Sequence, residues 1–133
     1  MASPSFDWSG YLTLADELAK SEDEAALRSA ISRAYYYVYH LALDRAEKND
    51  FTPVLGGAHV QLWRFFGGSP DPTCRRLGDL GNRLKENRHR ADYEPTYRRI
   101  SDEIPEMLKD ARKFAADLAN VPERLPNAKS QRQ

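Results

Sequence analysis

The sequence predicts an all-α fold, a bundle of four to five helices. Apolar residues recur every three or four positions along most of the 133-residue chain, as they do on one face of an α-helix. No stretch alternates convincingly with the period of two that is typical of strands. Glycines, prolines and capping residues divide the pattern into segments. We expect the two long segments, residues 22–48 and 71–90, to lie at the centre of the bundle.

The first two helices are separated by a capping signal. Apolar residues between Tyr11 and Ala19 predict a short first helix. Ser21 and Glu24 then form a capping-box pattern, in which the serine hydroxyl accepts from the glutamate amide and the glutamate side chain caps the serine. A long second helix should follow, to about Lys48. Its core stripe is expected to be Leu27, Ala30, Ile31, Ala34, Val38, Leu41 and Ala42.

A loop at residues 49–57, with one proline and two glycines, precedes a short third helix at residues 58–66. Asp71 and Pro72 mark the start of the fourth helix, as N-cap and first helical residue. This helix should fade between residues 88 and 93. Gly78 and Gly81 lie inside it, where each costs roughly 1 kcal/mol relative to alanine. Close approach of another backbone would justify them.

The fifth helix should start near Ser101, since Pro105 is tolerated in a first turn. Its apolar stripe is Ile104, Met107, Leu108, Ala111, Phe114, Ala115 and Leu118. Residues 122–133 contain two prolines and few apolar side chains, and we expect a frayed tail there. The predicted organisation is a single domain over residues 1–121 followed by a flexible tail over residues 122–133.

Composition places the chain among ordinary globular proteins and excludes several functional classes. No run of about 18 apolar residues is present, so no membrane span is expected. Residues 1–8 lack the basic and apolar segments of a secretory signal. The single cysteine, Cys74, excludes an intramolecular disulfide and a cysteine-cluster metal site, and fits a reducing cytoplasm. We therefore expect a cytoplasmic protein without a metal or other cofactor.

Net charge is zero, but the charges are unevenly distributed. Residues 1–50 carry nine acidic and five basic side chains, whereas residues 75–99 carry eight basic and four acidic ones. The basic residues of the second segment are Arg75, Arg76, Arg83, Lys85, Arg88, Arg90, Arg98 and Arg99. Arginine is suited to bidentate contacts with phosphate. The simpler interpretation is a solvated helix face that pairs with the acidic N-terminal half.

The second helix has an unusual face opposite its core stripe. At 100° per residue, Arg33, Tyr36, Tyr37 and His40 fall within about 100° of one another. Lysine and glutamate are the usual residues of a solvated face, whereas tyrosine and arginine are enriched at interfaces. Either these side chains form a partner surface or functional site, or further helices cover them as part of the core.

Two segments resemble one known family. Residues 32–40, Ser-Arg-Ala-Tyr-Tyr-Tyr-Val-Tyr-His, are similar to the long-helix signature of a prokaryotic subgroup of the HEPN family (higher eukaryotes and prokaryotes nucleotide-binding domain). In residues 88–93, Arg-His-Arg-Ala-Asp-Tyr, the first arginine is separated from Ala-Asp-Tyr by two residues, as in the subgroup's second signature. The resemblance extends over about residues 7–119 and includes His59 in the short middle helix.

The resemblance implies an antiparallel helical bundle that often dimerises, with the motif region near the subunit interface. We expect a homodimer with the face of Arg33, Tyr36, Tyr37 and His40, or the basic fourth helix, at or beside the interface. Many family members are metal-independent RNA endonucleases. They act as toxins paired with a nucleotidyltransferase-like antitoxin, or as effectors of phage defence. RNA and such an antitoxin are therefore the partners that the resemblance suggests for this chain.

The family's catalytic motif is an arginine, commonly followed by a polar residue, and then a histidine after four to six intervening residues. One alignment makes Arg88 the motif arginine, His89 its polar follower and Tyr93 the residue in the histidine's place. Arg83 with His89, and Arg33 with His40, also satisfy the spacing, the latter on a different helix. The candidate catalytic residues are Arg88, His89, Tyr93, Asp92, His40 and Arg33.

Cleavage of RNA without metal requires a base for the 2′-hydroxyl and a cation for the phosphorane. A histidine could move the proton, whereas Tyr93 would be a poor base near neutral pH. Tyrosine in the histidine's position favours a second interpretation, a catalytically degenerate protein that binds a nucleotidyltransferase-like partner or a nucleotide. A third is a helical adaptor whose tyrosine-rich face serves oligomerisation.

Overall fold

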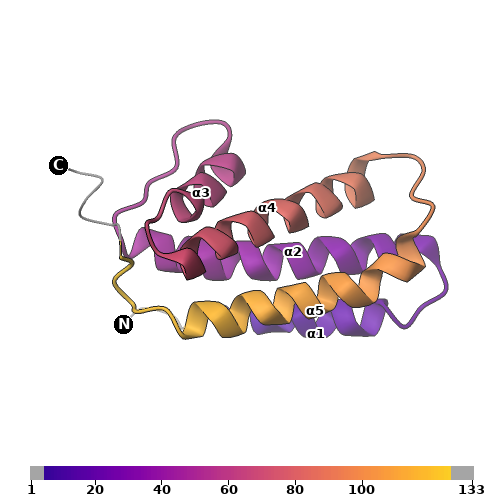
Figure 1. Cartoon of the computed structure of the whole chain (residues 1–133). Coiled ribbons are helices and arrows are strands. Elements are labelled where there is room, and N and C mark those ends of the chain that lie inside the picture. The colour runs from indigo at the N-terminus through magenta and orange to yellow at the C-terminus, as the bar shows by residue number, and fades with distance from the viewer. Residues whose placement is uncertain (1–4, 127–133) are drawn as a thin grey trace.

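The computed structural model describes residues 5–126, and all of its regular structure is helical, as the sequence predicts. The helices are α1 (Ser9–Leu18), α2 (Glu24–Glu47), α3 (Ala58–Gly67), α4 (Pro72–Tyr93) and α5 (Ile100–Ala119). Figure 1 shows α2 between α1 and α5 on one side and α3 and α4 on the other. Helix α2 contacts each of the other four helices, and α4 contacts α2, α3 and α5.

The start of α2 differs from the predicted capping box. Asp23 is the N-cap residue, and its carboxylate accepts from the amide of Ala26 at 3.3 Å. The Ser21 hydroxyl instead accepts from the amide of Asp23 at 3.0 Å, which shapes the turn before the helix. The prediction for Ser21 and Glu24 was therefore wrong by two positions. The Ser-x-x-Glu and Asp-x-x-Ala patterns overlap here, and an aspartate caps as well as a serine does.

Both ends of α4 are fixed by side chains. At its start, the Asp71 carboxylate accepts from the amide of Cys74 at 2.9 Å, with Pro72 in the first turn, as predicted. At its end, the Arg28 guanidinium of α2 donates to the carbonyls of Ala91 and Glu94, at 3.0 and 2.6 Å. Cations at a helix C-terminus satisfy carbonyls that have no partner within the helix. This contact holds the end of α4 beside α2.

The predicted core stripes of α2 and α5 are buried, except that Leu41, Leu108 and Ala115 are only partly covered. The core of α2 is nevertheless wider than one stripe. Tyr35, which belonged to neither predicted face, is 1% exposed, and Tyr37 is also buried. Because neighbours cover α2 on several sides, tyrosines around its circumference become core residues.

Helices α3 and α4 are in direct contact at Gly78 and Gly81. A Cβ atom added to Gly78 would lie 2.6 Å from the backbone nitrogen of Gly67, and one on Gly81 would lie 2.3 Å from the indole ring of Trp63. The close approach of another backbone that was expected is therefore present at Gly78, whereas at Gly81 the neighbour is a side chain. The Trp63 ring occupies the space that a side chain at position 81 would need.

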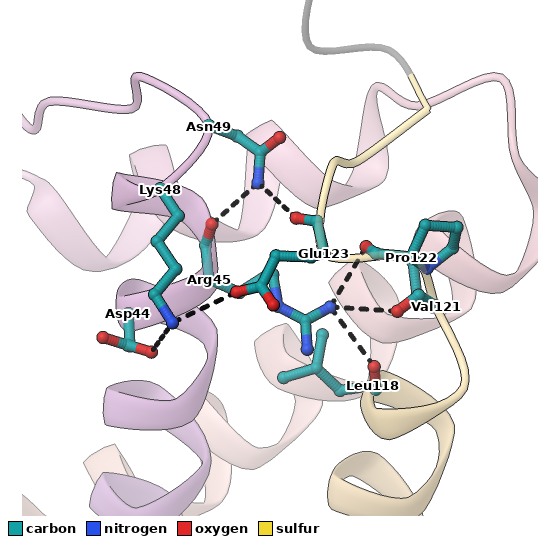
Figure 2. Close-up of polar contacts among 8 residues, drawn as sticks. All are labelled: Asp44, Arg45, Lys48, Asn49, Leu118, Val121, Pro122 and Glu123. Atoms are coloured by element: carbon teal, nitrogen blue, oxygen red, sulfur yellow. Dashed lines mark hydrogen bonds and ion pairs between the residues drawn. The ribbon is translucent and has the colours of Figure 1, made fainter.

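The segment after α5 is tied to the end of α2 (Figure 2). The Arg45 guanidinium donates to the carbonyls of Leu118, Val121 and Pro122 at 3.2 to 3.4 Å. The Asn49 side chain donates to the carbonyl of Glu123 at 3.0 Å and accepts from the amide of Leu125 at 2.8 Å. We refer to these contacts of Arg45 and Asn49 as the C-terminal clasp.

The clasp changes the predicted boundary of the tail. Val121 and Leu125 are buried, so the packed domain continues past residue 121 to residue 125. A pattern of two prolines suggested fraying, but the hydrogen bonds of Asn49 satisfy the backbone there instead. The rest of the predicted tail, residues 127–133, lies outside the described residues.

We predict that Gly81→Ala lowers the free energy of unfolding by about 1–3 kcal/mol, the usual cost of an overpacked core. The methyl group would meet the Trp63 ring, and the roughly 1 kcal/mol that alanine gains in helix propensity cannot offset that clash. Urea denaturation followed by circular dichroism measures the change. Gly67→Ala is the matched control, because nothing lies within 4 Å of its added Cβ. Equal stability of the two variants would contradict the assignment of a close contact.

Candidate functional site

A cleft of about 390 Å³ lies between the start of α3 and the later half of α4. Its lining combines a glycine and small apolar residues with ionisable side chains. The lining residues are Gly57, Ala58, His59, Val60, Lys85, Glu86, Arg88 and His89. Two cations, two histidines and one carboxylate thus border one small volume, with Glu86 paired to Lys85 at 3.5 Å. The excess of basic groups suits an anionic ligand.

Arg88 is mostly buried beside this cleft, with 13% of its side chain exposed. Its guanidinium carbon lies 5.6 Å from the ring centroids of Tyr35 and Tyr36 and 5.7 Å from that of Tyr93. These distances are within the range of cation–π attraction. The aromatic rings therefore hold the cation while leaving hydrogen-bond donors for other acceptors.

The charge of Arg88 is paired only loosely. Its Nη1 donates to the Asp92 carboxylate at 3.5 Å, which is long for a charge-assisted hydrogen bond. The Ser32 hydroxyl donates to the same carboxylate oxygen at 3.3 Å. Nε of Arg88 is buried and has no hydrogen-bond partner among residues 5–126. A buried donor without an acceptor is costly, so this guanidinium is suited to receive an anion.

Tyr36 connects the two predicted arginines. The guanidinium carbons of Arg33 and Arg88 each lie 5.6 Å from its ring centroid. Arg33 also lies 4.6 Å from the ring of Tyr11 in α1, and it does not line the cleft. Arg33 is therefore near Arg88 through a shared ring, but on the side that α1 covers.

The two predicted histidines lie in different places. His89 lines the cleft, and its ring is 5.0 Å from that of Tyr93, which is 66% exposed. His40 stacks on Trp8 at 3.5 Å, and burial lowers its pKa. The structure thus brings together Arg88, His89, Asp92 and Tyr93, and places His40 against the N-terminal segment. The contacts of Arg33 and His40 favour the second interpretation of this face, in which neighbouring residues of the same chain cover it.

His59 is the cleft residue that sequence reasoning left without a role. Its Nδ1 lies 2.6 Å from the Tyr35 hydroxyl, and its ring stacks on that of Tyr39 at 4.2 Å. Burial lowers its pKa, and the positive charges of Arg88, Lys85 and His40 act in the same direction. The available signal was a histidine in the first turn of a short helix, just after two glycines.

The basic run of residues 75–99 does not form an open basic stripe. Arg83 pairs with Asp110 at 3.1 Å, and Arg90 pairs with Glu103 at 3.4 Å, both across to α5. Arg75 donates to the carbonyls of Ser69 and Pro70. Several of these side chains are therefore paired, as the simpler interpretation expects, but not with the N-terminal half that it named. Their carboxylate partners include residues of α5 rather than of the acidic N-terminal half, because α4 packs along α5.

No protein-family model matches the chain, and no match was found among curated proteins or solved structures. Within residues 5–126, no three histidine, cysteine, aspartate or glutamate side chains are grouped so that they could hold a metal ion. None of the helices in that range is long and apolar enough to cross a bilayer.

We predict that stability falls as the pH is lowered below about 6.5, the ordinary pKa of histidine. The pKa values of His40 and His59 are lowered in the folded chain, so below pH 6.5 the unfolded chain binds more protons. Above that pH both histidines are neutral in the folded and in the unfolded chain, so they add no pH dependence to the free energy of unfolding. Urea denaturation at pH 7.5 and pH 5.5 measures the effect. The variant His40→Gln/His59→Gln should lose less stability over this interval, and an unchanged loss would refute the assignment.

Proposed function

We propose that the protein is a metal-independent RNA endonuclease of the HEPN type, with the scissile phosphate bound at Arg88. The observation that carries this proposal is the state of Arg88, a mostly buried cation with an unpaired donor beside a cleft. A phosphodiester supplies the acceptors that this guanidinium lacks. Lys85 borders the same cleft and adds a second positive charge, which is paired with Glu86 at 3.5 Å.

The chemistry requires one proton acceptor near the phosphate, and His89 is the predicted histidine that lines the cleft. In the proposed reaction, His89 accepts the proton of the 2′-hydroxyl and the 2′-oxygen attacks the phosphorus atom. The bond to the 5′-oxygen breaks, and that oxygen takes a proton from solvent. The products are a 2′,3′-cyclic phosphate and a free 5′-hydroxyl. Arg88 stabilises the negative charge that develops on the phosphorane oxygens.

A second candidate function is binding without cleavage. Tyr93 stands where the resembled motif has a histidine, and Asp92 already contacts Arg88. In this case Arg88 would bind a nucleotide or an acidic group of a nucleotidyltransferase-like partner. A role in a toxin–antitoxin or phage-defence system rests on the sequence resemblance. The adaptor function has less support, because Trp8 and Tyr11 cover the His40 and Arg33 end of the tyrosine-rich face.

We predict that the purified protein cleaves mixed RNA in the presence of EDTA and that Arg88→Gln lowers the rate by roughly 10²–10³-fold. This is the usual loss when one donor to a transition-state oxyanion is removed. Gel analysis of RNA fragments, with detection of 2′,3′-cyclic phosphate ends, measures the reaction. Arg76→Gln is the matched control on the same helix, since Arg76 hydrogen-bonds to Thr73 and lies outside the cleft.

The outcomes separate the candidate functions. Cleavage that survives both Arg88→Gln and His89→Gln would place the active site elsewhere. Absence of cleavage by the wild type, together with RNA or nucleotide binding that depends on Arg88, would support the binding function.

Homodimer formation is a further part of the proposal. Large apolar side chains beside the cleft are exposed, among them Leu55 at 103% and Val54 at 66%. Val60, which lines the cleft, is also exposed. Contiguous exposed apolar residues mark interaction sites. A second copy that covers this segment would bring two clefts close together, whereas the face around Arg33 and His40 is occupied by α1.

We predict a mass near twice the 15.2 kDa of the chain in light scattering at tens of micromolar protein. Leu55→Asp should shift the protein towards the monomer, because a charge would be buried in the interface. Lys109→Asp, a change of charge on the exposed face of α5, should leave the mass unchanged. A monomeric wild type at this concentration counts against the dimer but not against the cleft.

A further inference from the structure

His59 is the last member of a chain of hydrogen bonds that begins in the core. Nε1 of Trp63 donates to the Tyr35 hydroxyl at 3.2 Å, and the Tyr35 hydroxyl lies 2.6 Å from Nδ1 of His59. Trp63 and Tyr35 are 3% and 1% exposed, so water does not compete for these groups. The chain joins the close contact of α3 and α4 to a ring that lines the cleft.

The chemistry of the three groups fixes the direction of the protons. An indole nitrogen can only donate, so the Tyr35 oxygen accepts from Trp63. The hydroxyl proton of Tyr35 then needs an acceptor, and Nδ1 of His59 is the one within hydrogen-bond distance among the described residues. Burial raises the pKa of Tyr35, so this hydroxyl keeps its proton. His59 therefore accepts at Nδ1, and a neutral ring carries its own proton at Nε2.

The surroundings of His59 disfavour a second proton. His59 is the second residue of α3, where the positive end of the helix dipole opposes an imidazolium. Arg88 and Lys85 of α4 and His40 of α2 are the basic groups that act on it. Glu86 of α4 is the acidic residue that lines the same cleft, and the rings of Tyr36 and Tyr39 pack against the imidazole. If Nδ1 carried a proton, both His59 and Trp63 would donate to the Tyr35 hydroxyl oxygen. The hydroxyl proton of Tyr35 would then have no acceptor.

We infer that His59 is a neutral hydrogen-bond donor at pH 7, with its proton on Nε2, that contacts a phosphate oxygen bound at Arg88. Tyr35 and Trp63 are positioning residues that select this tautomer. That Nε2–H of His59 donates to a phosphate oxygen rests on the proposed function. The assignment of the tautomer does not. A neutral imidazole at a helix N-terminus acts in this way, as an electrophile, in enzymes of known mechanism. His59 thus complements His89, because one donates to the oxyanion and the other moves the proton.

The tautomer is tested directly by ¹⁵N-correlated NMR of the histidine rings at pH 7. We expect His59 to show a pyridine-type Nδ1 and a pyrrole-type, protonated Nε2. In Tyr35→Phe this preference should disappear, since the ring is kept and the hydroxyl is lost. A protonated Nδ1 or a doubly protonated ring in the wild type would overturn the inference, whether or not the protein cleaves RNA.

The donor role is tested with a 2′-O-methyl oligonucleotide, which cannot be cleaved by attack of its 2′-oxygen. Its addition should shift the Nε2–H resonance of His59 in the wild type but not in Arg88→Gln. An unshifted resonance with a bound oligonucleotide would refute the contact.

Two substitutions at position 59 distinguish a donor from a base. The amide of His59→Gln can donate from nearly the position of Nε2, so this variant should keep cleavage within about tenfold. His59→Leu cannot donate and should lose roughly 10²–10³-fold. Equal, severe losses in both variants would show that His59 moves a proton instead. Should the wild type not cleave at all, the proposed nuclease fails, and the NMR experiments still decide the tautomer and the contact.

Discussion

The contact between Trp63 and Gly81 is the constraint on which the candidate site depends. Because position 81 has no side chain, the indole ring can lie against α4, and α3 is held at that distance. The same placement brings Nε1 of Trp63 to the Tyr35 hydroxyl and the start of α3 to the later half of α4. A packing requirement in the core thus determines which polar groups face one another across the cleft.

Adjacent tyrosines of α2 serve different neighbours. Successive residues of a helix point about 100° apart, so Tyr35 is directed to α3 while Tyr36 contacts the two arginines. The cation of Arg88 is surrounded by ring faces rather than by carboxylates, with Asp92 as its one acidic partner within 4 Å among the described residues. The rings hold the positive charge in place without neutralising it, and Asp92 pairs it only at 3.5 Å.

The features that could be predicted from the sequence are those that depend on local spacing. The five helices follow from periodicity and from caps such as Asp71, and Arg88 and Asp92 meet because they lie four residues apart on one helix. The role of His59 could not be predicted, because its partners on α2 and α4 come together only when three helices pack. The carboxylates of α5 that pair with Arg83 and Arg90 were missed for the same reason. Single hydrogen bonds make Asp23 the N-cap in place of Ser21 and hold the backbone of Leu125 to Asn49. The composition of the sequence does not reveal these bonds.

The C-terminal clasp has a consequence for the order in which the chain can fold during synthesis. It joins residues that are 73 to 77 positions apart in the sequence. At about 5–20 residues per second, the ribosome needs about 4–15 seconds to produce the partners of Arg45 and Asn49 after α2 is complete. Until α5 has emerged, the side of α2 that faces α5 is uncovered, although the pairs α1–α2 and α3–α4, which are neighbours in the sequence, can already form. The nascent chain therefore passes through a period in which apolar residues of α2 are open to chaperones, and it ends when residues 118–125 emerge.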